Sequence, residues 1–185
     1  MFDSLPDIPR LFTTLAEWGA ALVYVFVVAR SASTHALSPD AATPRWRLAA
    51  AAFGGLAVLA TAHELLGRAP LTLWVPGMMV AYALVWVVLH VGTGLDWRWV
   101  THMSARAFIV AELAASLASQ VVVYSHADKP FWHPVSFGGY AVIASACPGV
   151  AYVFERRVFR QGALPILRLA DLASGLFIGI AIFAL

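Results

Sequence analysis

The sequence predicts an all-α fold, a polytopic bundle of about six transmembrane helices. Of its 185 residues, 61% are hydrophobic and only 12% are charged, which lies outside the range of soluble globular domains. The apolar residues fall into six segments, each close to the roughly 20 residues that a helix needs to cross a bilayer. Because the connections are short, we expect a single integral-membrane domain over residues 1–185.

Residues that end helices separate the six segments. Proline or glycine stands in every connection, for example Pro39 and Pro44 after the first segment and Gly92 and Gly94 after the third. The first ten residues carry acids and no basic region or cleavage site, so we expect the first segment to be a retained helix and not a signal peptide. The predicted helices are 11–30, 48–67, 72–92, 104–125, 136–155 and 164–185.

The basic residues predict the orientation of the bundle. Nine arginines lie in or beside the connections after the first, third and fifth segments, whereas only Arg10, Arg68 and Lys129 lie on the opposite side. Positive residues favour the cytoplasmic side, so we expect both termini outside the cytoplasm and, in a bacterium, an inner-membrane location. The basic residues form no run or soluble patch, so the net charge of +2 does not indicate a nucleic-acid partner.

Two pairs of segments resemble each other. The pattern Trp74, Pro76, Tyr82 in the third segment recurs at the same spacing as Trp132, Pro134, Tyr140 in the fifth. The sequence 111–114 (AELA) of the fourth segment is echoed by 170–173 (ADLA) in the sixth. This indicates a parallel duplication of the third-to-fourth and fifth-to-sixth hairpins.

Small residues, tryptophans and one proline indicate how the helices pack. Small residues four apart allow close helix contacts in lipid. They are Ala51 with Gly55, Ala111 with Ala115 and Ser119, and Gly175 with Gly179. Pro148 inside the fifth segment is a candidate hinge. The tryptophans near predicted helix ends, expected to be interfacial anchors, are Trp18, Trp46, Trp74, Trp97, Trp99 and Trp132.

The stretch 107–126 carries a polar stripe through the predicted membrane. On a helix, Glu112, Ser116 and Ser119 lie on one face, and His126 returns to nearly the same face. A lone charge facing lipid costs at least about 2.5–3.5 kcal/mol on insertion scales. We therefore expect the stripe to face other helices or a wet cavity.

Other carboxylates also fall within predicted helices. Glu17 and Asp171 lie well inside the membrane, and Glu64 lies closer to the outer face. Such residues mark proton relays, cation paths or substrate sites. Two of them have simpler readings: Asp171 can pair with Arg168 three residues earlier, and Glu17 can hydrogen-bond to His63 or to a hydroxyl.

Histidines on the outer side offer two possible cofactor sites. His63, His126, His133 and Asp128, with the neighbouring glutamates, could bind a divalent metal such as zinc or copper, although their spacing matches no known motif. Alternatively, His63 and His126 could clamp a haem b between the second and fourth helices. A haem at this site requires the second and fourth helices to be adjacent. His90 and His102 would then be a possible second pair of haem ligands at the inner face.

The motifs that define several enzyme classes are absent. The chain contains no GxSxG, HExxH, Walker loop or GxGxxG, and no dense histidine set of a membrane di-iron enzyme. With Cys147 as the single cysteine, the chain alone supplies no disulfide or CxxC pair. We therefore favour a protein that is not an enzyme.

The last third of the chain resembles one enzyme family. Trp132, the run 136–139 (SFGG), the arginine pair 156–157 and the run 169–173 (LADLA) are similar to the middle of bacterial prolipoprotein diacylglyceryl transferases. The histidine that precedes the glycine pair in that family is missing here. The resemblance therefore does not imply the transferase activity.

Three functions fit these observations. The first is a transporter- or channel-like subunit that moves a proton, cation or small solute past Glu112, Ser116 and Ser119, with Asp171, Glu17 and Glu64 alongside. The second is a redox subunit that binds haem or quinone through His63 and His126. The third is a non-catalytic scaffold within a larger membrane complex. In each case the partners are lipid and either further copies of the chain or other membrane subunits.

Overall fold

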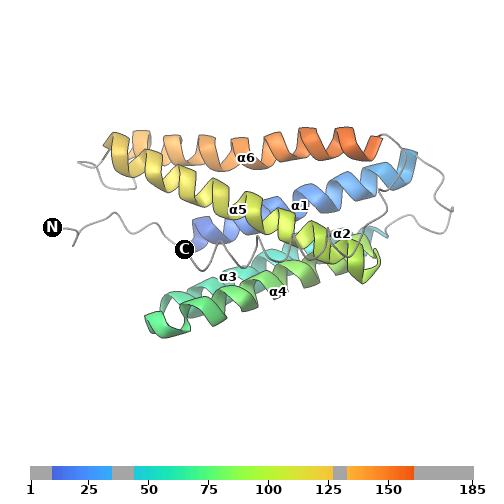
Figure 1. Ribbon diagram of the computed structural model, residues 1–185, viewed down its shortest axis with the longest axis horizontal. Helices are drawn as coiled ribbons and strands as arrows, with labels where there is room; N and C mark the ends of the chain where they lie inside the picture. The colour runs from blue at the N-terminus through green and yellow to red at the C-terminus, as the bar shows by residue number, and fades with distance from the viewer. Residues whose placement is uncertain (1–9, 35–43, 127–132, 161–185) are drawn as a thin grey trace.

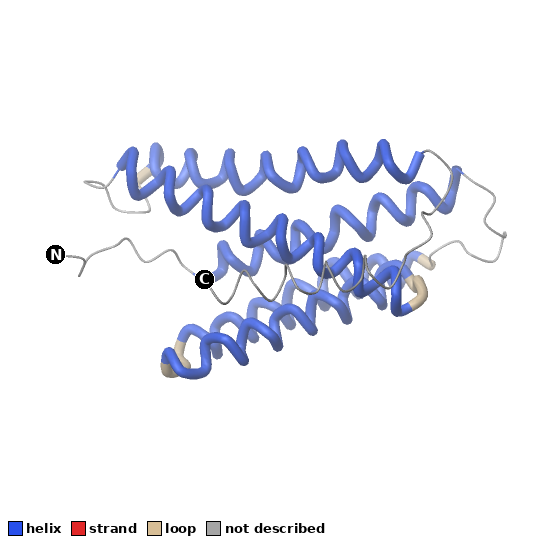
Figure 2. The backbone as a smooth tube through the Cα atoms, viewed as in Figure 1, coloured by secondary structure: helices blue, strands red, loops and turns tan. Residues whose placement is uncertain are grey.

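The computed structural model describes residues 10–34, 44–126 and 133–160, and the regular elements in these ranges are all helical (Figures 1 and 2). The all-α prediction is confirmed for this part of the chain. The elements are α1 (Arg10–Thr34), α2 (Arg45–Ala49), the π-helical turn η2 (Ala50–Gly54), α3 (Gly55–Gly67), the 3-10 turn η3 (Leu71–Leu73), α4 (Trp74–Thr93), α5 (Trp97–His126) and α6 (Pro134–Arg160).

Each of the first five predicted segments corresponds to a helix, with α2, η2 and α3 forming the continuous helix Arg45–Gly67. The largest error is at α5, which begins at Trp97 and not at residue 104, because the helix continues past its apolar part into polar residues. The helices Arg45–Gly67, Trp74–Thr93 and Pro134–Arg157 are long and apolar enough to cross a membrane, as an integral membrane protein requires. The predicted sixth segment, 164–185, lies outside the described residues.

Helix α1 occupies the middle of the bundle. It packs against α3, α4, α5 and α6, and Figure 1 shows it between the α5–α6 pair and the α3–α4 pair. Its buried face is built mainly from small residues, Ala16, Ala20, Ala21 and Val25. Small side chains let helix backbones approach closely where no hydrophobic effect drives association. The composition of α1 therefore suits a helix surrounded by others.

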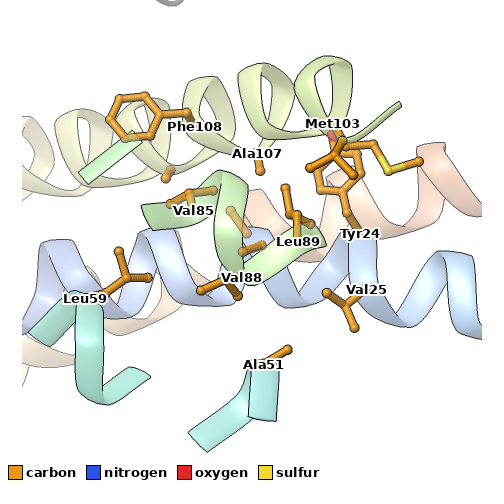
Figure 3. Close-up of a cluster of buried hydrophobic side chains, with 14 of the residues drawn as sticks. Tyr24, Val25, Ala51, Leu59, Val85, Val88, Leu89, Met103, Ala107 and Phe108 are labelled. Carbon is orange, nitrogen blue, oxygen red and sulfur yellow. The ribbon is translucent and has the colours of Figure 1, made fainter. Parts of the chain in front are cut away.

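The main hydrophobic core joins all the described helices except α6. In Figure 3, Tyr24 and Val25 of α1 lie among side chains of η2, α3, α4 and α5. The buried stripe of α5 includes Ala107, Ala111, Ala114 and Ala118. Of the small residues predicted to pack, Ala111 lies in this stripe, whereas Ala115 and Ser119 are half-buried at its edge.

The π-helical turn η2 bonds to α1. The indole Nε1 of Trp18 donates a hydrogen bond to the carbonyl oxygen of Ala52, at 2.7 Å. A π turn shifts the backbone hydrogen-bond register, which makes a carbonyl available to a side chain. Trp18 is therefore half-buried and bonded between helices, a role in packing that its prediction as an interfacial anchor did not include. Trp46 and Trp97, by contrast, are exposed at helix ends, as an interfacial anchor requires.

Gly92 marks the tightest described contact among α4, α1 and η2. A Cβ atom at Gly92 would lie 2.8 Å from Val25 Cγ2 and 2.9 Å from Ala51 Cβ, which is closer than real Cβ contacts. We expect Gly92→Ala to lower the free energy of unfolding by about 1–3 kcal/mol through overpacking. The measurement is an SDS titration of the purified protein in mixed micelles, followed by circular dichroism.

Gly54→Ala is the matched control for this substitution. Gly54 is also helical, with φ −65° and ψ −42°, but a Cβ atom there meets nothing within 4 Å. Alanine is favoured over glycine in a helix by roughly 0.5–1 kcal/mol, so Gly54→Ala should be neutral or stabilising. Equal effects of the two substitutions would show that the contact at Gly92 is not tight.

Candidate functional site

A carboxylate and an imidazole form a buried pair between α1 and α3. Glu17 is 1% exposed and His63 is 2% exposed, and His63 Nε2 lies 2.9 Å from Glu17 Oε2, at hydrogen-bonding distance. The predicted hydrogen bond between Glu17 and His63 is thus confirmed. At this distance the imidazole N–H can donate a hydrogen bond to the carboxylate oxygen.

Glu112 of α5 lies close to this pair. It is half-buried, and it is near enough for its charge to interact with those of Glu17 and His63. Within the described part of the chain, Glu112 Oε1 and Glu17 Oε1 are buried oxygens without a hydrogen-bond partner. A buried acceptor left unpaired costs roughly 1–3 kcal/mol, so such atoms in a native structure require an explanation. We call Glu17, His63 and Glu112 the acid–imidazole cluster.

A second polar cluster joins α1, α5 and α6. Arg106 Nη2 lies 2.6 Å from Glu155 Oε1, and the Tyr24 hydroxyl donates a hydrogen bond of 3.2 Å to the same oxygen. Glu155 is 3% exposed, whereas the Arg106 side chain is 44% exposed. We call Tyr24, Arg106 and Glu155 the arginine cluster. Its carboxylate is held in place by a cation that reaches the protein surface.

The two clusters lie at two depths along one face of α1. Glu17 and Tyr24 are seven residues apart on α1, hence on one face and about 10 Å apart along the axis. On α5, which packs against α1, Glu112 and Arg106 are six residues apart, about 9 Å along the axis. Helix α1 therefore carries ionisable groups at two depths, whereas Glu112 and Arg106 point about 120° apart around α5.

The sequence analysis did not single out Glu155 or Tyr24. Glu155 precedes two arginines near a predicted helix end and looked like an ordinary terminal charge. Arg106 had been used only to predict orientation. One residue could have indicated this second cluster from the sequence. Tyr24 lies two helical turns from Glu17, on the same face of a helix whose buried residues are mostly alanine and valine.

Other predicted path residues lie away from these clusters or outside the described residues. Ser116 is exposed and Ser119 is half-buried. Glu64 is exposed and forms a local ion pair of 2.7 Å with Arg68, four residues later. Pro148 lies within α6, which is assigned as one helix from Pro134 to Arg160. Asp171 belongs to the part of the chain that is not described.

The histidines are dispersed, and the described ones do not form a metal centre. Across residues 10–34, 44–126 and 133–160, the structure contains no group of three His, Cys, Asp or Glu side chains arranged to hold a metal. His133 is half-buried at the start of α6 and His90 is exposed, stacked on Trp86. His126 is the last residue of α5, and Asp128 lies outside the described residues.

The surroundings of His63 do not fit the predicted haem site. Its Nε2 atom, which would bind the iron, is hydrogen-bonded to Glu17. Helix α1 packs on both α3 and α5, so it lies between the helices that carry His63 and His126. Direct contact between α3 and α5 is not among the main packing contacts of the described residues.

No protein family model, curated protein or solved structure matches this chain. The similarity to prolipoprotein diacylglyceryl transferases thus remains a local resemblance in sequence. The proposal for the function therefore depends on the geometry of the acid–imidazole and arginine clusters.

Proposed function

We propose that this chain is a multi-pass membrane protein that acts as a transporter- or channel-like subunit and moves protons along the α1–α5 interface. The buried Glu17–His63 pair beside Glu112 is the observation that carries this proposal. Ionisable residues inside a membrane bundle are costly and mark proton or ion pathways. In this proposal the bundle has six helices and both termini lie outside the cytoplasm, in a bacterial inner membrane.

The acid–imidazole cluster suits a proton better than a metal cation or a large solute. Carboxylate and imidazole each bind and release a proton with little rearrangement. A cation such as Ca²⁺ or Mg²⁺ would need about six oxygen ligands, whereas this cluster offers two carboxylates, one of them already bonded to His63. A proton can pass between Glu112 and the Glu17–His63 pair through the two unpaired oxygens, Glu112 Oε1 and Glu17 Oε1.

The arginine cluster supplies the second stage of the proposed route. Tyr24 lies on the same face of α1 as Glu17, closer to the end of the bundle where α5 begins. Its hydroxyl donates to Glu155, and Arg106 connects this carboxylate to the surface. This end of the bundle carries most of the arginines, so it faces the cytoplasm in the proposed orientation.

Glu112→Gln is the direct test of the proposed route. We expect it to reduce proton flux, driven by a pH gradient across proteoliposomes, by about tenfold or more, because a positioned proton carrier contributes at least that much. The flux is followed with a pH-sensitive dye trapped inside the vesicles. Asp96→Asn is the matched control, since it removes a carboxylate charge from an exposed position immediately before α5 and should leave the flux unchanged.

Two results would overturn the proposal. One is a wild-type flux no greater than that of empty liposomes, and the other is an unchanged flux in Glu112→Gln. A Soret band in the purified protein would instead establish a haem-binding redox subunit. Copurification with stoichiometric membrane partners, together with no flux by the chain alone, would establish the scaffold function.

A further inference from the structure

Three arginines and two tryptophans gather where α2 begins and α4 meets α5. Arg45, Trp46 and Arg47 belong to α2, and Trp97 and Arg98 open α5. Helix α2 packs against α4, and the Arg47 guanidinium lies directly against Gly94, the residue with φ +66° that ends α4. These contacts bring Arg47 to the α4–α5 turn, where only Leu95 and Asp96 separate Gly94 from Trp97. We call these five residues the arginine–tryptophan patch.

The patch carries positive charge that no described carboxylate neutralises. The guanidinium carbons of Arg47 and Arg98 lie 5.4 Å from the ring centroids of Trp46 and Trp97, respectively. Within the described ranges, none of the patch arginines forms an ion pair. The nearby Asp96 accepts a backbone hydrogen bond of 3.3 Å from the N–H of Arg98, at the start of α5. Arg45 and Arg98 are exposed and Arg47 is half-buried, so three guanidinium groups stand beside one carboxylate.

The tryptophans indicate the depth of the patch in a bilayer. Trp46 is 63% exposed and Trp97 is 53% exposed, and exposed indoles at the ends of membrane helices lie at the level of lipid headgroups. Guanidinium groups at this depth meet lipid phosphates, which they can bind with two parallel hydrogen bonds. Exposed Phe53 continues the apolar surface from Trp46 along the same continuous helix.

From these observations we infer that the arginine–tryptophan patch binds the headgroup of an anionic phospholipid. The guanidinium groups hold the phosphate, the indoles lie beside the glycerol region, and the apolar surface that includes Phe53 contacts an acyl chain. This surface favours a membrane lipid over a free phosphate, which would use the arginines alone. The inference is independent of the proposed proton route, because it involves neither polar cluster.

The test is lipid selectivity in a phosphatidylcholine membrane. The purified chain is reconstituted with trace spin-labelled phosphatidylglycerol or spin-labelled phosphatidylcholine, and electron paramagnetic resonance measures the immobilised fraction of each. We expect phosphatidylglycerol to be preferred, and the preference to fall about fivefold for each arginine replaced in Arg47→Gln and Arg98→Gln. Circular dichroism checks the fold of each variant. If Arg47→Gln disturbs the packing against Gly94, Arg98→Gln tests the proposed lipid site by itself.

Arg157→Gln is the control for nonspecific attraction. Arg157 is exposed at the same end of the bundle, but on α6, which contains no tryptophan. We expect this variant to retain the wild-type preference. An equal loss in Arg157→Gln and Arg98→Gln would show general attraction by positive charge and would overturn the proposed site. Absence of any preference in the wild-type protein would do the same.

Discussion

His63→Leu is expected to lower the free energy of unfolding by about 3–5 kcal/mol, the cost of leaving a buried charge without its partner. Glu17 would then remain 1% exposed, with both oxygens unpaired among the described residues. Because both residues are buried between α1 and α3, the carboxylate has little access to solvent that could replace the lost imidazole. SDS titration in mixed micelles, read by circular dichroism, measures the change.

A double-mutant cycle separates the pair from the loss of packing. Glu17→Leu with His63→Leu removes both polar partners, and replacement of a buried ion pair by apolar residues is often neutral or stabilising. We therefore expect the double variant to be more stable than His63→Leu alone, with a coupling of about 0.5–3 kcal/mol. Strictly additive losses would mean that the 2.9 Å contact contributes no interaction.

Arg106→Leu is expected to destabilise the protein by about 3–5 kcal/mol, because Glu155 would remain buried without its cation. Glu155→Leu should cost less, about 1–3 kcal/mol, mainly through the loss of the acceptor for the Tyr24 hydroxyl. The difference arises because the half-exposed Arg106 can turn to solvent, whereas Glu155 cannot. The same SDS titration compares the two variants.

The matched control for this comparison is Arg68→Leu. Arg68 also pairs with a glutamate, but both side chains are exposed, so the change should stay within about 1 kcal/mol. If Glu155→Leu proved more destabilising than Arg106→Leu, the burial difference would not govern the energetics of the arginine cluster.

Hydropathy alone predicted the helices, because the thickness of a bilayer fixes the length of each apolar segment. Glu17 and His63 were also predicted as possible partners, since both fall in the outer half of the predicted membrane. The Arg106–Glu155 pair could not be predicted in this way, because it depends on α5 and α6 being neighbours. Spacing along one helix contains no information about which helices touch.

The polar stripe of α5 shows the same limit. Helical periodicity correctly places Glu112 and Ser116 close together on the surface of α5. The buried contact, however, follows the alanines 107, 111, 114 and 118, and it leaves Glu112 at the border and Ser116 exposed. Residues 40° apart around a helix can therefore differ in environment, as 3.6 residues per turn allows. The positions of α1, α4 and α6, which all pack against α5, decide on which side of the border each residue lies.

The central position of α1 has a consequence for biosynthesis. As the first helix of the bundle to leave the ribosome, α1 carries Glu17 into the membrane 46 residues before His63 is made, and Tyr24 131 residues before Glu155. Its polar groups thus lack their final partners while most of the chain is translated. The pairing of Glu17 therefore depends on the arrival of α3, and that of Tyr24 on the arrival of α6. Assembly of the bundle is therefore tied to the order of translation, with α6 closing around a helix that was made first.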